Sequence, residues 1–217
     1  IGEKLMLSKY LKILLVCIFV VLVAVQADKS LVLDEIDFPI VSHATSQTFK
    51  PIYYRGEQSP AHVGTYHPTL YINSLAVFVK AFGYNEISVR FYGVLCTLIT
   101  AGLLVLILRQ VTKKSGKTEV LLLGLFLLNP YTIANTTLPD IDSTIMPVVI
   151  LLFIYYSLRY LLQNRDTSNK VILILGSLFG LALWSKLTTP LIIPPFLACL
   201  ALIASKDYKK SLVFALK

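Results

Sequence analysis

Apolar residues occur in long runs along this chain, and short polar segments separate the runs. A run of about 20 apolar residues is long enough to cross a bilayer as a helix. The segment Pro68–Phe82 is also rich in apolar residues but contains Lys80, and it predicts a helix along the membrane interface. Residues 28–67 are polar without strong periodicity and predict a loop. The apolar runs that predict membrane crossings are Leu11–Ala27, Ser88–Leu108, Val120–Leu128, Ile145–Leu162, Val171–Trp184 and Pro190–Ala204.

The first run and the last two runs each leave two interpretations open. Leu11–Ala27 has three lysines at or before its start, so it is either a cleaved signal peptide or an uncleaved first span, and the later apolar runs favour the uncleaved span. Val171–Trp184 and Pro190–Ala204 are shorter than a straight span. They form either two short spans or one re-entrant hairpin, and in both cases Lys186 between them lies near the outer face.

The composition agrees with a membrane protein. Of the 217 residues, 56% are hydrophobic and 15% are charged, whereas soluble domains have roughly 25% charged residues. The net charge of +8 would suit a nucleic-acid partner, but the basic residues form short clusters between the apolar runs. We therefore expect contact with membrane lipids and no nucleic acid.

The basic clusters predict the topology, because Lys and Arg accumulate in short cytoplasmic loops. Residues 1–12, 109–117, 159–170 and 205–210 together hold 13 of the 20 basic residues, and the alternate loops hold eight of the twelve acids. This asymmetry places the N-terminus and the C-terminal end in the cytoplasm. We predict an all-α integral membrane protein with about six transmembrane or re-entrant helices, an outer loop and an interfacial helix.

We expect residues 1–217 to form a single transmembrane domain, in which residues 28–87 are the first outer loop and the interfacial helix. The chain begins with Ile1, and Ser211–Lys217 resembles the start of another apolar segment. We therefore expect this chain to be the N-terminal part of a longer protein. Its membrane would be the cytoplasmic (inner) membrane in a prokaryote or the endoplasmic reticulum in a eukaryote.

Acidic residues concentrate in the segments assigned to the outer face. Asp34 and Glu35 closely follow the first span. A carboxylate near a low-dielectric boundary has a raised pKa and can act as a general base, and a solvated acidic loop is the alternative. Asp140 and Asp142 could bind a cation or position an acceptor, or one of them could cap the next helix.

Two further residues could bind ligands. Lys186 lies between two apolar runs, where its ammonium either snorkels to the interface or binds an anion such as a lipid phosphate. His67 stands in the sequence Tyr66-His67-Pro68-Thr69-Leu70-Tyr71, at a junction between the outer loop and the predicted interfacial helix. A single histidine and a proline near the first helical turn also fit a purely local role.

The order of these motifs, rather than any one of them, resembles the polyprenyl-phosphate-sugar glycosyltransferases, which are membrane enzymes with the GT-C fold. They include the protein O-mannosyltransferases and the lipid A aminoarabinose transferases. The resemblance covers roughly residues 10–205, and this chain has Thr69 where many relatives have a second proline. The matching stretches are Asp34-Glu35, His67–Tyr71, Tyr84–Arg90, Asn129-Pro130 and Gly180–Lys186.

The resemblance implies transfer of a sugar from a polyprenyl-phosphate donor to a protein, lipid or glycan acceptor on the non-cytoplasmic face. Asp34 matches the catalytic acidic residue of the first outer loop, with Glu35 beside it. Lys186 matches a basic residue near the lipid phosphate, and Arg90 matches an arginine ahead of the second span. The resemblance thus assigns the donor phosphate to these two cations.

Asp142, or alternatively Asp140, matches the acid of the second outer loop, and we assign both, with His67, to an acceptor or cation site. A lipid phosphate leaves readily when positive charge stabilises it. We therefore expect that no cofactor is required, although an acid cluster could hold a divalent cation. The sequence assigns no metal ligand.

Two other functions remain as alternatives. A transporter or channel subunit should carry charged residues inside its spans, near the midplane. Here the charges lie at the span ends and in the outer loops, which favours an enzyme at the interface. A non-catalytic truncated homologue is the second alternative.

Overall fold

The computed structural model is all-helical throughout the residues that it describes, which are 2–27, 34–48, 69–112, 116–138, 140–163 and 168–205. The predicted all-α fold is confirmed for these residues. The helices in chain order are α1 (Gly2–Gln26), α2 (Asp34–Thr48), α4 (Leu70–Phe82), α5 (Glu86–Thr112), α6 (Lys117–Leu127), α7 (Pro130–Thr136), α8 (Ile145–Ser157), η1 (Leu158–Gln163), α9 (Asn169–Ser185), η2 (Thr189–Ile192) and α10 (Ile193–Ser205).

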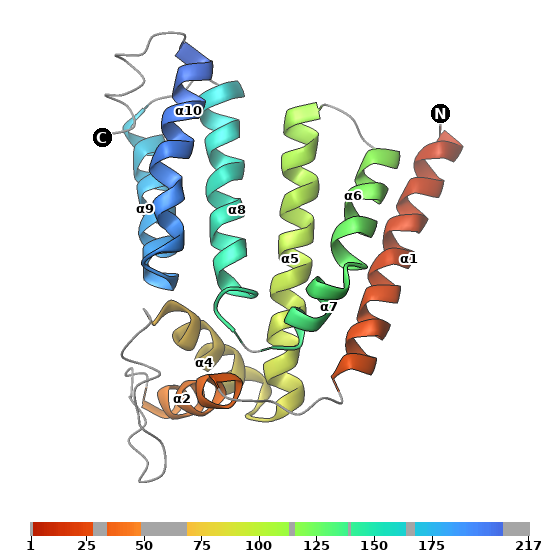
Figure 1. The fold of residues 1–217 in the computed structure, drawn as a ribbon, viewed down its shortest axis with the longest axis vertical. Coiled ribbons are helices and arrows are strands. Elements are labelled where there is room, and N and C mark those ends of the chain that lie inside the picture. The colour runs from red at the N-terminus through yellow and green to blue at the C-terminus, as the bar shows by residue number, and fades with distance from the viewer. Residues whose placement is uncertain are drawn as a thin grey trace.

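The helices have two orientations (Figure 1). Helices α1, α5, α6, α8, α9 and α10 run side by side along the long axis, whereas α2 and α4 lie across one end, which we call the α2–α4 end. The start of α1, the end of α5 and the starts of α6 and α9 lie at the opposite end. These are the helix ends beside the basic segments, so the helices alternate in direction as the charge pattern requires.

Two helices are long and apolar enough, by length and composition, to cross a membrane. They are α1, over Met6–Gln26, and α5, over Glu86–Thr112. The apolar helices α8, α9 and α10 are shorter in the described part of the chain. The π-helical segment η1 continues α8, and together they cover the predicted run Ile145–Leu162. The six crossings therefore remain a prediction that the order and direction of the helices support.

Helix α2 corrects one prediction. Residues 34–48 were expected in a polar loop, but they form a helix that packs against α4, with the ring of Phe38 edge-on to that of Tyr71 at 5.3 Å. Its buried positions follow at intervals of three and four residues, as on one face of a helix. Three of these six side chains carry hydroxyl groups, so the stripe shows no apolar periodicity. The stripe is Phe38, Pro39, Val41, Ser42, Thr45 and Ser46.

A glycine allows α7 to lie directly against α5. A Cβ atom built on Gly93 would lie 2.3 Å from the backbone oxygen of Thr136. Small residues allow helix backbones to approach in this way. One turn along α5, the hydroxyl of Thr97 lies 2.9 Å from that of Thr136 and hydrogen-bonds to it. This contact positions the loop between α7 and α8, which carries two of the predicted site residues.

At the end opposite α2 and α4, a buried carboxylate joins three helices. Glu119 of α6 accepts hydrogen bonds from Lys12 Nζ of α1 at 2.6 Å and from Arg109 of α5, whose Nε and Nη2 lie at 2.6 and 3.0 Å. The two cations are themselves partly exposed. The side chains that bind Glu119 are therefore also the ones that mainly cover it. Their hydrogen bonds connect α1, α5 and α6.

Candidate functional site

The structure brings Lys186 and Asp142 together at the α2–α4 end. Helix α9 ends at Ser185, and Lys186 follows in an extended conformation. Its Nζ lies 2.8 Å from Oδ1 and 2.6 Å from Oδ2 of Asp142, which lies in the loop before α8. The two side chains are 27% and 48% exposed. Two predicted site residues that are 44 positions apart thus form one accessible ion pair.

A second contact ties the same end of α9 to the start of α4. The indole Nε1 of Trp184 donates to the hydroxyl of Thr69 at 3.0 Å, and Asn73 Nδ2 donates to the same oxygen at 3.3 Å. A proline at position 69 would provide no such side-chain acceptor. The end of α9 is therefore bonded to both α4 and the loop before α8, and these contacts hold Lys186 in place.

Neither acidic residue of this loop caps α8, so that alternative is wrong. Thr144 precedes α8 without a capping side-chain bond. Instead, Asp140 shapes the turn: its Oδ1 accepts the backbone N–H of Ile141 at 2.7 Å, and its carbonyl accepts the hydroxyl of Thr144. The pKa of Asp140 is raised, mainly by burial and then by the negative charge of Asp142. The backbone N–H groups of Ile141 and Asp142 and the charge of Lys186 lower this pKa, but by less.

Arg90 lies in a different environment from Lys186. It is buried, with only 6% of its surface exposed. Its Nε and Nη2 bind Glu86 Oε1 one turn earlier in α5, and its Nη1 donates to the backbone oxygen of Thr137 at 3.0 Å. Arg90 thus fixes the beginning of the loop whose later residue Asp142 binds Lys186. Through these contacts Arg90 holds the start of this loop in place, and its contact with the donor phosphate stays a prediction.

The Asn129-Pro130 motif begins a helix. Asn129 Oδ1 accepts the backbone N–H of Tyr131 at 2.9 Å, and Pro130 occupies the first position of α7. Asparagine at the cap and proline at the first helical position both favour a helix start. The motif therefore determines where α7 begins, and so where the following loop emerges.

The remaining predicted residues are placed only in part. Asp34 and Glu35 open α2, which packs on α4, but their side chains lie outside the described part of the structure. His67 also lies outside the described residues. Among the described residues, no three His, Cys, Asp or Glu side chains come together as a metal site would require.

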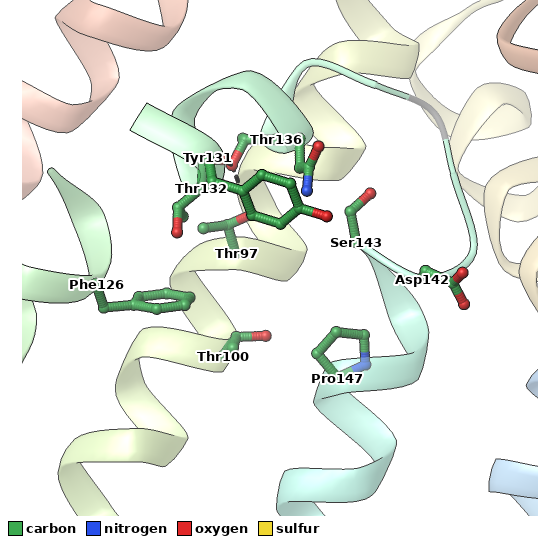
Figure 2. Close-up of a pocket in the computed structure, with 10 residues that line it drawn as sticks. Thr97, Thr100, Phe126, Tyr131, Thr132, Thr136, Asp142, Ser143 and Pro147 are labelled. Atoms are coloured by element: carbon green, nitrogen blue, oxygen red, sulfur yellow. Dashed lines mark hydrogen bonds between the residues drawn. The ribbon is translucent and has the colours of Figure 1, made fainter. Parts of the chain in front are cut away.

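A pocket that the sequence patterns did not predict lies on the other side of Asp142, between α5, α6, α7 and α8. Figure 2 shows Tyr131, Phe126 and several hydroxyl-bearing side chains around a common space. Two pairs of threonines at helical spacing could have indicated it. Thr97 and Thr100 lie inside the apolar run Ser88–Leu108, and Thr132 and Thr136 follow Pro130. The pocket has a volume of about 190 Å³ and is lined by Thr97, Thr100, Phe126, Tyr131, Thr132, Asn135, Thr136, Asp142, Ser143 and Pro147.

Comparison with known families matches residues 66–216 to the dolichyl-phosphate-mannose-protein mannosyltransferase family. Comparison with curated proteins and with solved structures gives no match. The matched range is more than half of the chain, and it contains α4, both contacts of the α9 end and the pocket. This family consists of membrane-embedded glycosyltransferases of the GT-C type, as the resemblance predicted. The chain belongs to the dolichyl-phosphate-mannose-protein mannosyltransferase family.

Proposed function

We propose that the protein transfers a sugar from a polyprenyl-phosphate donor to a protein, lipid or glycan acceptor on the non-cytoplasmic face of its membrane. The observation that carries this proposal is the ion pair between Lys186 and Asp142 at the α2–α4 end. In the proposed reaction Lys186 binds the donor phosphate, and Asp142 keeps its ammonium in position.

The bonding of Lys186 supports this role. An ammonium has three N–H donors, and the two oxygens of Asp142 are its only hydrogen-bond acceptors in the described part of the chain. The side chain is also partly exposed. One donor thus remains for a phosphate oxygen, and exposed ion pairs contribute only about 0–1 kcal/mol. An arriving phosphate can therefore share the ammonium with Asp142 or displace it at little cost.

The charge of the leaving group explains why a cation is needed. The phosphate of the donor is a diester with one negative charge, and it becomes a monoester with up to two charges when the bond to the sugar breaks. A fixed ammonium therefore interacts more strongly with the leaving phosphate than with the bound donor. This difference is what accelerates the chemical step.

Asp34 is the proposed base. Its carboxylate takes the proton of the acceptor hydroxyl, the acceptor oxygen bonds to the anomeric carbon, and the bond between that carbon and the phosphate oxygen breaks. Because positive charge stabilises the phosphate, the step does not require a metal. Asp140 and Asp142, with His67, are the residues where a divalent cation could bind.

The positions of the charges favour an enzyme over a transporter. Lys186 follows the last residue of α9, Asp142 lies in a loop, and Arg90 lies in the second turn of α5. A transport path would place such groups near the middle of the spans. Family membership and the accessible ion pair together support catalysis at the end of the helix bundle.

The test measures sugar transfer by membranes carrying the protein encoded by the complete gene, over a range of donor concentrations. Loss of a charge-assisted contact removes about 1.5–3 kcal/mol, so Lys186→Gln should lower transfer at limiting donor by roughly 10- to 150-fold. Lys186→Arg keeps the charge but changes its shape and reach, and should recover part of the activity. Asp142→Asn should give a smaller loss, because it frees the ammonium without removing it.

Lys170 provides the matched control, because it lies at the other end of the same helix and is exposed. Lys170→Gln should transfer sugar like the wild type. Equal activity of Lys186→Gln and Lys170→Gln would contradict the role of Lys186. Absence of transfer by the wild-type protein with every polyprenyl-phosphate sugar tested would favour the non-catalytic alternative.

A further inference from the structure

The cluster around Glu119, at the end of the bundle opposite α2 and α4, carries more positive than negative charge. Lys12 of α1 and Arg109 of α5 both bond to this one buried carboxylate. Glu119 is the only acidic side chain that the structure describes at this end. The carboxylate neutralises one of the two cations, so one positive charge remains, and it attracts an anion.

Both cations keep hydrogen-bond donors for a further ligand. The ammonium of Lys12 has three N–H donors, and within the described residues it bonds only to Glu119 Oε2. Arg109 bonds to the carboxylate through Nε and Nη2, which leaves its Nη1. The side chains of Lys12 and Arg109 are 25% and 51% exposed. A ligand outside the bundle can therefore reach both cations.

The carboxylate places these two cations side by side. Lys12 Nζ and Arg109 Nη2 lie 2.6 and 3.0 Å from the same oxygen, Oε2 of Glu119. A phosphate group has several oxygens, and the guanidinium of an arginine can bind two of them at once. One phosphate can therefore contact both cations while they stay bonded to Glu119. The bonds to Glu119 also hold the two side chains in place beforehand, which lowers the entropic cost of binding.

Two exposed lysines extend the positive surface around this cluster. Lys9 lies three residues before Lys12 on α1, and residues at this spacing are neighbours on a helix. Lys117 is the first residue of α6, and Figure 1 shows the start of α6 beside the first turns of α1. Within the part of the chain that the structure describes, neither lysine forms a hydrogen bond or an ion pair. Both ammonium groups are therefore available to the same anion.

The helix surfaces next to these cations are apolar and exposed. Tyr10 and Leu14 of α1 are 64% and 53% exposed, and Leu121 and Leu125 of α6 are 62% and 67% exposed. Tyrosine is enriched where lipid head groups meet the hydrocarbon. A soluble phosphate would gain nothing from these surfaces, whereas the acyl chains of a phospholipid would cover them. The combination of cations and apolar surface therefore fits a lipid with a negatively charged head group.

We propose that an anionic phospholipid binds at this end of the bundle, with its phosphate on Lys12 and Arg109 and its acyl chains along α1 and α6. Lys9 and Lys117 lie beside its head group. The charge pattern predicts that this end faces the cytoplasmic leaflet, whose anionic lipids attract basic segments. The site lies at the opposite end from the proposed sugar-transfer site, so lipid binding can be measured without sugar transfer.

The probe is phosphatidylglycerol, and phosphatidylcholine with the same acyl chains is the comparison without net charge. Each lipid is added to the detergent-purified protein encoded by the complete gene. Native mass spectrometry gives the apparent Kd, and the thermal midpoint reports binding because a ligand of the folded state stabilises it. Phosphatidylglycerol should bind at least about 5-fold more tightly than phosphatidylcholine. Inorganic phosphate at the same concentration should leave the midpoint unchanged, because it has no acyl chains.

Three substitutions test the site without leaving Glu119 unpaired. Lys9→Gln and Lys117→Gln should each weaken phosphatidylglycerol binding by about 5-fold, the contribution of one basic residue near anionic lipid. Both should leave the midpoint of the lipid-free protein unchanged, because neither lysine bonds to another described residue. Arg109→Lys keeps a cation beside Glu119 but loses the planar guanidinium, so binding should weaken by about 10-fold.

Lys170→Gln and Arg159→Gln are the matched controls. They remove exposed cations at the same end of the bundle, on α9 and on η1, which continues α8, across the bundle from α1 (Figure 1). Both should bind phosphatidylglycerol like the wild type. Equal binding of the two lipids, or wild-type binding by all three test variants, would overturn the proposal. An equal rise in midpoint with inorganic phosphate would also overturn it, because the ligand would then be a soluble anion.

Discussion

Gly93→Ala tests the close contact between α5 and α7, on which the position of the following loop depends. The added methyl group would lie 2.3 Å from the backbone oxygen of Thr136 and 3.4 Å from its carbonyl carbon. Because both atoms belong to the backbone, no change of side-chain rotamer relieves the contact. The two helices must therefore move apart, which also strains the neighbouring bond between Thr97 and Thr136.

The magnitude follows from two opposing terms. Replacing a glycine inside a helix by alanine stabilises the helix by about 0.5–1 kcal/mol, and overpacking at a close contact costs about 1–3 kcal/mol. Gly102 of the same helix has nothing within 4 Å of a built Cβ, so Gly102→Ala carries the first term alone. Gly93→Ala should therefore be about 1–3 kcal/mol less stable than Gly102→Ala, or about 2–12 °C lower in thermal midpoint.

The assay compares both variants with the wild type after purification in the same detergent. Aliquots are heated, and the fraction that remains monodisperse on gel filtration gives the midpoint. Transfer activity should fall in Gly93→Ala as well, because α7 leads into Thr137, where Arg90 holds the loop before α8. Equal midpoints and equal activity for Gly93→Ala and Gly102→Ala would refute the contact between α5 and α7.

Four further outcomes are expected. Asp34→Asn should lower transfer by about 10²–10⁴-fold in the membrane assay without lowering expression. If this variant transfers sugar like the wild type, Glu35 becomes the candidate base. Glu119→Gln should lower the thermal stability by about 1–3 kcal/mol, and a double-mutant cycle with Lys12→Met should be non-additive. Asp140→Asn should have a higher thermal midpoint than the wild type at neutral pH, because the raised pKa of Asp140 means that its ionisation costs more in the folded state. The difference from the wild type should disappear on acidification, when Asp140 is protonated in both the folded and the unfolded protein. Thr188→Cys, in a chain without its three native cysteines, should react with an impermeant thiol reagent in intact cells, and reaction only after lysis would reverse the topology.

Local patterns predicted α1 and α5 correctly but not α2. The two long helices are apolar along almost their whole length, so composition alone identifies them. Helix α2 packs against α4 and buries Ser42, Thr45 and Ser46, and a buried face rich in hydroxyl-bearing residues looks polar in a sequence. Contacts with a neighbouring helix, rather than apolar periodicity, therefore stabilise this segment as a helix.

The motifs were easier to find than to interpret. Asn129 and Pro130 match a family motif, and in the structure they form the N-terminal cap and the first residue of α7. Arg90 and Lys186 looked equivalent as cations near the outer face, yet one is buried against Glu86 and the other is accessible beside Asp142. Residue type fixes the charge of a side chain, but its burial depends on the elements that pack around it.

The sequence by itself determined the all-α class and the alternating direction of the helices, because hydrophobicity and charge act within each segment. The family resemblance likewise came from the order of short motifs. Only the tertiary structure decided that Asp142 binds Lys186, that Arg90 holds Thr137 and that threonines of α5 and α7 share a pocket. These arrangements join residues 32 to 47 positions apart. Their geometry depends on how closely the helices pack, which the order of residues in each helix does not specify.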